Sequence, residues 1–204
     1  AAARAALGDE PRVEAVEGLA ALCARLEGER VILLMLPAGD AVEETIRALV
    51  PLVATGDTLV DGGNSYYRDS MRRALALSQQ GLRYIDAGVS GGVHGLEHGY
   101  CLMLGGTPKS IEIFEPFARA LAPGPERGWL HCGPSGAGHF AKMIHNGIEY
   151  GMMAAMAEGL NILDHAGIAV GRPDDDPEIA PLKGPERFRY DLDLAAITEV
   201  WRRG

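Results

Sequence analysis

The sequence predicts an α/β protein in which a partial parallel sheet is followed by a long helix that opens an all-α domain. Three observations predict it. Short apolar runs, such as Val31–Leu36, are typical of strands that are buried on both faces of a parallel sheet. Segments with helical spacing alternate with these runs over short connections. Residues 133–161 then have the mostly apolar surface of one long buried helix.

Helices and strands are expected to alternate over the first half of the chain. The apolar residues of 14–27 have helical spacing, and Asp40 can cap a later helix through its carboxylate. In order, we expect a helix over 14–27, a strand over 31–36, a helix over about 40–50, a strand over 58–60, a helix over 65–80 and a strand over 84–87. Such alternation favours parallel strands with right-handed crossovers.

The second half continues this pattern and then changes to helices alone. We expect a strand over 99–106, a helix over 108–121, a short edge strand over 129–131, a long helix over about 135–165 and a helix over 191–203. Glycine-rich residues around 91–98 are expected to form a loop, as is the acidic Pro-Asp-Asp-Asp-Pro segment at 173–177. Residues 1–12 are alanine-rich and then turn-like.

Polar or glycine-rich tips follow three of the predicted strands. They are Pro37-Ala38-Gly39, Gly62-Gly63-Asn64-Ser65 and Ser90-Gly91-Gly92. Each could be an ordinary turn. In parallel sheets, however, ligands bind beyond the carboxyl ends of the strands, so three such tips at one edge indicate a binding site.

A stripe of polar side chains interrupts the long apolar helix. Lys142, His145, Asn146, Glu149 and Tyr150 fall at i, i+3, i+4, i+7 and i+8 and therefore share one face over about two turns, ~10 Å. If they were buried without partners they would cost several kcal/mol, so the stripe needs either mutual pairing or a polar ligand. The alternative is a solvated face with a Lys–Glu pair.

Composition and charge exclude several classes of protein. The formal net charge is −9 and no Lys/Arg cluster forms a stripe, so nucleic acid is not an expected partner. There is neither an apolar run of membrane-spanning length nor a signal peptide, which predicts a soluble cytoplasmic protein without membrane contact. The cysteines are three in number and scattered, as reduced thiols are. His94 and His98 lie in the glycine-rich segment, and no metal site is expected.

Three motifs resemble one family of enzymes. GPSGAGHFAKMIHNGIEYG, DGGNS and DAGVSGGVHGLEHGYCLMLGG are closely similar to the decarboxylating 6-phosphogluconate dehydrogenases, and the tail KGPERFRYDLDLAAITEVWRRG resembles their shorter bacterial form. The most specific element is K-x-x-H-N-G-x-E-Y at 142–150. The wider β-hydroxyacid dehydrogenases share the Ser-Gly-Gly and the Lys…Asn pair but are not expected to have His-Asn-Gly-Ile-Glu-Tyr. The resemblance implies an incomplete Rossmann-like dinucleotide-binding domain over 1–132 and the start of a helical substrate and dimerisation domain over 133–204.

The same resemblance implies a reaction and a role for each site residue. The reaction is oxidative decarboxylation of 6-phosphogluconate to ribulose 5-phosphate in the pentose phosphate pathway, with hydride transfer to NAD or NADP. Lys142 would be the base and Glu149 the acid, so desolvation around the lysine and apolar surroundings for the carboxyl are expected. The implied substrate-binding residues are Asn64, Ser90, Gly91, Gly92, His145, Asn146 and Tyr150, and the implied cofactor-binding residues are Leu36, Pro37, Ala38 and Asn64.

The sequence also departs from the family pattern. No G-x-G-x-x-G fingerprint precedes Val31, and the sequence stops as the helical domain begins. We therefore expect a fragment of a longer, homo-oligomeric enzyme, a dimer or larger, that is inactive alone. Two alternatives stay open. One is a 3-hydroxyisobutyrate-type β-hydroxyacid dehydrogenase, which uses Lys142 but needs no acid at Glu149; the other is a non-catalytic structural fragment.

Overall fold

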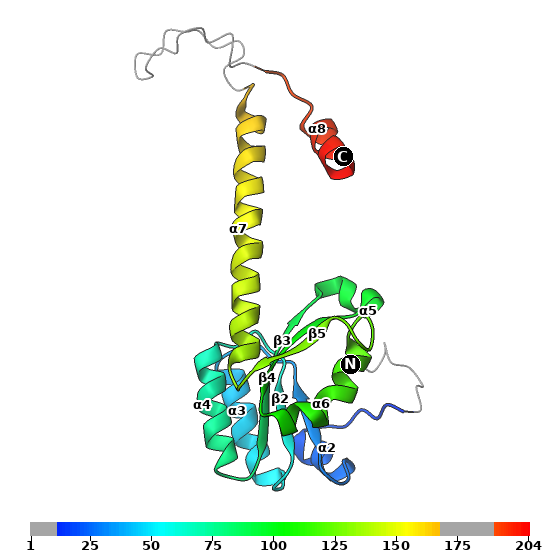
Figure 1. Cartoon of the computed structure of the whole chain (residues 1–204), viewed down its shortest axis with the longest axis vertical. Helices are drawn as coiled ribbons and strands as arrows, with labels where there is room; N and C mark the ends of the chain where they lie inside the picture. Colours follow the sequence, from blue (N-terminus) through cyan, green and yellow to red (C-terminus); the bar gives the residue numbers. More distant parts are fainter. Residues whose placement is uncertain (1–11, 168–189) are drawn as a thin grey trace. The chain divides into compact units, whose positions relative to one another are not determined.

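A computed structural model describes residues 12–167 and 190–204 (Figure 1). The chain divides into two compact units, Ala1–His145 and Asn146–Gly204, with the boundary inside helix α7. The first unit holds a five-stranded sheet in the order β1-β2-β3-β4-β5, with helices on both faces. The alanine-rich start and the predicted loop at 173–177 lie outside the described residues. An α/β fold with a Rossmann-like sheet and a following long helix is therefore confirmed.

The elements follow the predicted order. The strands are β1 (Val31–Leu34), β2 (Thr58–Asp61), β3 (Arg83–Ser90), β4 (Cys101–Gly106) and β5 (Trp129–Gly133). The α-helices are α2 (Leu19–Arg25), α3 (Asp40–Leu49), α4 (Tyr67–Ser78), α5 (Gly95–His98), α6 (Pro108–Leu121), α7 (Ala137–His165) and α8 (Leu194–Arg203). Two 3₁₀ turns, η1 (Val50–Leu52) and η2 (Gly92–His94), complete the described elements.

The sheet is mixed, whereas the sequence predicts it to be parallel. β1, β2 and β3 are parallel, but β4 runs antiparallel to β3 and β5 runs parallel to β4. The reason is the connection after β3. Ser90 pairs with Cys101, so the ten intervening residues turn back at the same edge of the sheet. A parallel return would need a crossover of a dozen or more residues.

Apolar side chains from alternate strand positions form a core on each face of the sheet. Leu59 and Tyr84 belong to one cluster with α2, α3 and α4, and their neighbours Val60 and Ile85 belong to the other with α6. Strand β2 is therefore buried on both faces, as predicted. Strand β1 is not, because Leu33 is 41% exposed at the edge of the described sheet.

Three local predictions need correction. Helix α2 is shorter than expected, because Gly18 adopts a φ of 84° immediately before it. Gly39, with a φ of 93°, rather than Asp40 is the N-cap of α3, and no side chain caps that helix. The segment after Gly91 is not a loop but the two short helical pieces η2 and α5.

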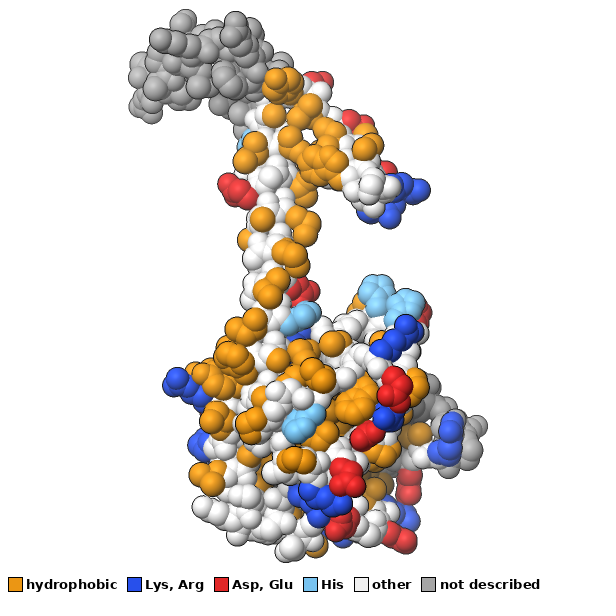
Figure 2. Space-filling model, viewed as in Figure 1, with side chains coloured by type: hydrophobic (Ala, Val, Ile, Leu, Met, Phe, Trp, Pro, Cys, Tyr) orange, Lys and Arg blue, Asp and Glu red, His pale blue; other side chains and the backbone are white. Residues whose placement is uncertain are grey.

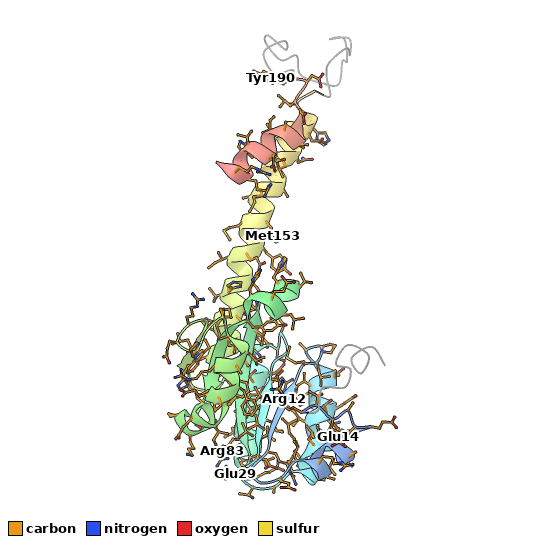
Figure 3. All side chains as sticks on the ribbon, turned by 90° about the vertical axis from the view of Figure 1, so that its right-hand side faces the viewer. Arg12, Glu14, Glu29, Arg83, Met153 and Tyr190 are labelled. Atoms are coloured by element: carbon orange, nitrogen blue, oxygen red, sulfur yellow. The ribbon has the colours of Figure 1, made fainter. Side chains whose placement is uncertain are left out.

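Ion pairs lie at the amino ends of the parallel strands. Arg83 begins β3 and its Nη1 lies 3.0 Å from Glu29 Oε2. Both residues are labelled in Figure 3. Asp57, which is 2% exposed, accepts hydrogen bonds from the backbone N–H groups of Arg30 and Ala54. The polar tips at which the sequence predicts a binding site follow the opposite, carboxyl ends of the strands.

Helix α7 is largely exposed after its first turns, although its composition predicts a buried helix. Met143, Ile144, Ile148, Met152, Met153 and Met156 are each at least 40% exposed. Figure 2 shows hydrophobic side chains along the helix, and Met153 is labelled on it in Figure 3. Within the described residues, no helix is both long and apolar enough to cross a membrane.

Candidate active site

The strand order brings the first two polar tips together. Leu34 of β1 pairs with Asp61 of β2, so the segments that follow leave the sheet at the same edge. They touch: a Cβ atom on Gly63 would lie 2.7 Å from the carbonyl oxygen of Leu36. Leu36 packs against the core, whereas Pro37, Ala38 and Asn64 are exposed. The structure thus places the predicted cofactor-binding residues side by side.

Buried charges support the tip after β2. The carboxylate of Asp61 is fully buried and accepts hydrogen bonds from the Gly63 N–H at 3.1 Å, from Arg73 at 3.0 Å and from the Tyr84 hydroxyl at 3.1 Å. Burial, and then the charge of Asp61, raises the pKa of Tyr84, which keeps the phenol a donor. This network cannot be predicted from local sequence patterns, because its members come from three separate elements.

Arg73 extends the network to the surface. Its Nε donates to Glu43 at 2.9 Å, and Arg72 also binds this carboxylate. Partial burial alone would raise the pKa of Glu43, but the hydrogen bonds from Arg72 and Arg73 outweigh it and lower the pKa. The tip that ends in Asn64 is therefore supported by a chain of alternating charges.

The Ser-Gly-Gly tip follows β3 in a conformation that requires glycine. Gly91 has a φ of 143° and Gly92 a φ of 50°. A Cβ atom on Gly91 would lie 3.1 Å from the Tyr100 ring, which also packs on Gly95. Ser90 is half-buried and both glycines are exposed, so this backbone is accessible to a ligand.

Lys142 is the buried basic group of the site. Lys142 is only 8% exposed, which is unusual for a lysine. The side chain begins directly over β3, because a Cβ atom on Gly88 would lie 2.5 Å from Lys142 Cβ and 3.2 Å from its Cγ. Lys142 is thus buried against β3 at Gly88, which lies two residues before the Ser-Gly-Gly tip.

The other polar residues of the stripe are more exposed. His145, the last residue of the first unit, is exposed. In the second unit Asn146 is half-buried, and Glu149 and Tyr150 are exposed on α7. The apolar surroundings expected for Glu149 are not supplied by the part of the chain that the structure describes.

Two buried residues near Lys142 are not among the site residues predicted from the sequence. Asp86 of β3 is fully buried and accepts hydrogen bonds from the N–H groups of Gly136 and His139, at the start of α7. The ring of His139 is also buried and shares a 2.7 Å hydrogen bond between its Nδ1 and Ser70 Oγ. A signal for Asp86 exists, since it is a carboxylate inside the apolar strand Tyr-Ile-Asp-Ala.

Within the described residues, neither His94, at the end of η2, nor His98, at the end of α5, belongs to a cluster that could hold a metal ion. His94 and His98 stack with ring centroids 6.3 Å apart. Over residues 12–167 and 190–204, no group of three or more His, Cys, Asp or Glu side chains could hold a metal ion. His131 contacts the carbonyl oxygens of Gly106 and Gly133 through Nε2 instead.

Accessible strand ends along one edge of an α/β sheet are where Rossmann-like domains bind dinucleotides, so the fold and site are those of this class of domain. A family model described as the NAD binding domain of 6-phosphogluconate dehydrogenase matches residues 1–132, and one described as the C-terminal domain of that enzyme matches residues 138–170. The chain belongs to the 6-phosphogluconate dehydrogenase family, which confirms the resemblance of its motifs.

Individual relatives agree with this assignment. The chain is 39% identical over 203 residues to the NAD(+)-dependent, decarboxylating 6-phosphogluconate dehydrogenase of Haloferax volcanii, covering 100% of this chain and 58% of that protein. It is 40% identical over 176 residues to the decarboxylating enzyme of Haemophilus influenzae, covering 85% and 36%. A Plasmodium falciparum 6-phosphogluconate dehydrogenase structure matches with a TM-score of 0.64 and 32% identity, over 71% of this chain and 31% of that one. The chain thus spans less than two thirds of each.

Proposed function

We propose that this chain is part of a decarboxylating 6-phosphogluconate dehydrogenase, which oxidises 6-phosphogluconate to ribulose 5-phosphate and carbon dioxide with NAD or NADP. The observation that carries the proposal is the buried Lys142, held over Gly88 next to the Ser-Gly-Gly tip. The names of the relatives supply the substrate class.

Lys142 would take the proton of the substrate alcohol. A base must carry a free lone pair and lie within hydrogen-bond reach of the proton that it removes. The stem of Lys142 is fixed by contact with β3, so the amine would meet the substrate in one orientation. Once protonated, Lys142 would polarise the ketone and so assist the loss of carbon dioxide.

Glu149 would return a proton to the substrate carbon after decarboxylation. It lies seven residues beyond Lys142 on the same helix, which is about two turns. A sugar acid of five or six carbons matches this spacing better than a direct ion pair does. Since Glu149 is exposed in the described chain, the apolar surroundings expected for a proton donor would have to come from further surfaces.

The remaining residues would bind the substrate. Ser90, Gly91 and Gly92 offer a hydroxyl and accessible N–H groups to the carboxylate, in the manner of a backbone anion site. His145 and Asn146 would bind sugar hydroxyls, Tyr150 the phosphate, and Asn64 both substrate and cofactor. Each assignment follows the family pattern at that position.

The described residues fit the nicotinamide half of a cofactor. Pro37 and Ala38 are exposed, and Leu36, which precedes them, packs against the core and contacts Gly63, the residue before Asn64. NAD or NADP, when bound there, accepts the hydride. We also propose the division into a dinucleotide-binding domain over 1–132 and a helical domain over 133–204. A homo-oligomeric assembly and a cytoplasmic location stay predictions.

The experiment uses the complete reading frame that encodes this chain, supplied with 6-phosphogluconate and each cofactor. Cofactor reduction and carbon dioxide release are followed in parallel, and equal yields support the proposal. Reduction without release would favour a hydroxyacid dehydrogenase of the 3-hydroxyisobutyrate type, and no reduction with either cofactor would refute the proposal. Glu149→Gln should slow turnover only in the decarboxylating case, while Glu158→Gln, on the same helix outside the site, serves as the matched control.

A further inference from the structure

Asp86 joins the central strand β3 to the start of α7. Its carboxylate is 0% exposed, and its two oxygens accept separate hydrogen bonds, at 2.6 Å from the Gly136 N–H and at 2.9 Å from the His139 N–H. N–H groups in the first turn of a helix have no partners inside the helix. A buried carboxylate that accepts two of them makes strong, charge-assisted hydrogen bonds and complements the helix dipole.

Glycines at the same junction bring helix and sheet into direct contact. A Cβ atom on Gly138 would lie 2.4 Å from the carbonyl oxygens of Asp86 and Met103. One on Gly105 would lie 2.5 Å from Asp86 Oδ1. With backbone this close on both sides, the carboxylate has little freedom, and neither has the first turn of α7.

Lys142 lies one turn beyond His139 on this helix. Its stem packs on Gly88, two residues after Asp86 and therefore on the same face of β3. The two contacts together determine how far α7 is rotated and how high it sits along the strand. A rotation of the first turn would move Lys142 off Gly88.

We propose that Asp86 is a positioning residue that sets the register of α7 on the sheet and so holds Lys142 in its buried place. Its catalytic significance rests on the proposed role of Lys142 as the base. The placement of Lys142 does not depend on that role and can be measured without substrate.

The test is competitive acetylation of lysine amines in the 204-residue chain, read by mass spectrometry. The described residues contain two lysines, and exposed Lys109, which pairs with Glu112, is the internal reference for Lys142. In Asp86→Asn the amide keeps the shape but turns a donor toward the helix N–H groups. The labelling ratio of Lys142 to Lys109 should rise about fivefold or more, because the start of α7 opens locally.

Asp57→Asn is the matched control. Asp57 is an equally buried carboxylate that accepts two backbone N–H groups, but at the amino ends of the strands. It should lower the melting temperature without changing the Lys142 ratio. An unchanged ratio in a folded Asp86→Asn chain, or an equal rise in Asp57→Asn, would overturn the proposal.

A second variant covers the case in which Asp86→Asn does not fold. Gly138→Ala adds a methyl group at the same junction, on the helix side, and should also raise the labelling ratio of Lys142 to Lys109. An unchanged ratio in the folded Gly138→Ala chain would count against the proposed role of Asp86. In the complete reading frame, Asp86→Asn should lower kcat by about tenfold to a hundredfold with little change in KM. Absence of turnover in the unmodified enzyme would refute the proposed function, while the labelling ratio would still decide the role of Asp86.

Discussion

At the scale of single residues, several glycines allow the elements of the candidate site to approach one another closely. Gly88 gives Lys142 its position, Gly63 lets the tips after β1 and β2 touch, and Gly138 brings α7 onto the sheet. In each case a backbone or a side-chain stem occupies the volume that a Cβ atom would need. The geometry of the candidate site therefore depends on residues that have no side chain.

Gly88→Ala tests this dependence. The new methyl group would lie 2.5 Å from Lys142 Cβ and 2.9 Å from the Gly138 carbonyl oxygen, so α7 must shift. We expect a loss of about 1–3 kcal/mol in the free energy of unfolding, measured by urea denaturation. Gly159→Ala, in open space on α7, is the control and should be neutral or stabilising. Equal effects of the two changes would contradict the packing argument.

Glu43→Gln tests the charge network through its pH dependence. Because the folded state lowers the pKa of Glu43, its ionisation stabilises the fold above the unfolded pKa of about 4.3 and loses this effect as pH falls through the folded value. The variant should be about 1 kcal/mol less stable near neutral pH, and the difference should shrink as the pH falls from about 4.3 toward about 3. Thermal melts between these pH values measure the difference. Glu44→Gln, exposed on the same helix, should show no such convergence.

At the scale of elements, local sequence signals decide where most helices and strands begin. Helix α6 matches its predicted bounds, Pro108–Leu121, because Pro108 starts the helix and Thr107 caps it by accepting the Ser110 N–H at 3.2 Å. Helix α3 shows where such signals fail. Gly39 reaches a positive φ and takes the cap position that Asp40 is predicted to hold.

Removal of the α6 cap should destabilise the first unit. Thr107→Ala leaves the Ser110 N–H without its side-chain acceptor and should cost about 1 kcal/mol in chemical denaturation. Thr107→Ser keeps the hydroxyl and should retain most of that stability. If alanine and serine prove equal, the cap contributes nothing measurable.

At the scale of the whole molecule, the exposed apolar surface of α7 is expected to promote association. Met152, Met153 and Met156 are each more than half exposed, and exposed apolar patches promote association. We expect the 204-residue chain to self-associate in sedimentation velocity at micromolar concentration. Met152→Lys with Met156→Lys should shift it toward monomer, whereas Glu158→Lys should not. A monodisperse parent chain would refute this expectation.

Cofactor affinity is the second property of the whole chain. No glycine-rich fingerprint precedes Val31, although such a loop is what holds the pyrophosphate of a dinucleotide. Isothermal titration of the 204-residue chain with NAD and with NADP should therefore show weak or undetectable binding. Tight binding of either would mean that the strand-end tips suffice.

The sequence by itself determined the order of the elements, the strand ends at which a site is proposed, and the family. Periodicity, turn residues and spaced motifs are local, so they can be read before folding. Only the tertiary structure decided that β4 is antiparallel, that Lys142 is buried over Gly88, and that Asp86 and Asp61 brace the elements on which the site lies. These facts depend on contacts between segments far apart in the chain. The burial of an apolar helix such as α7 likewise depends on which other surfaces surround it. The spacing of apolar residues along the sequence cannot show which surfaces those are.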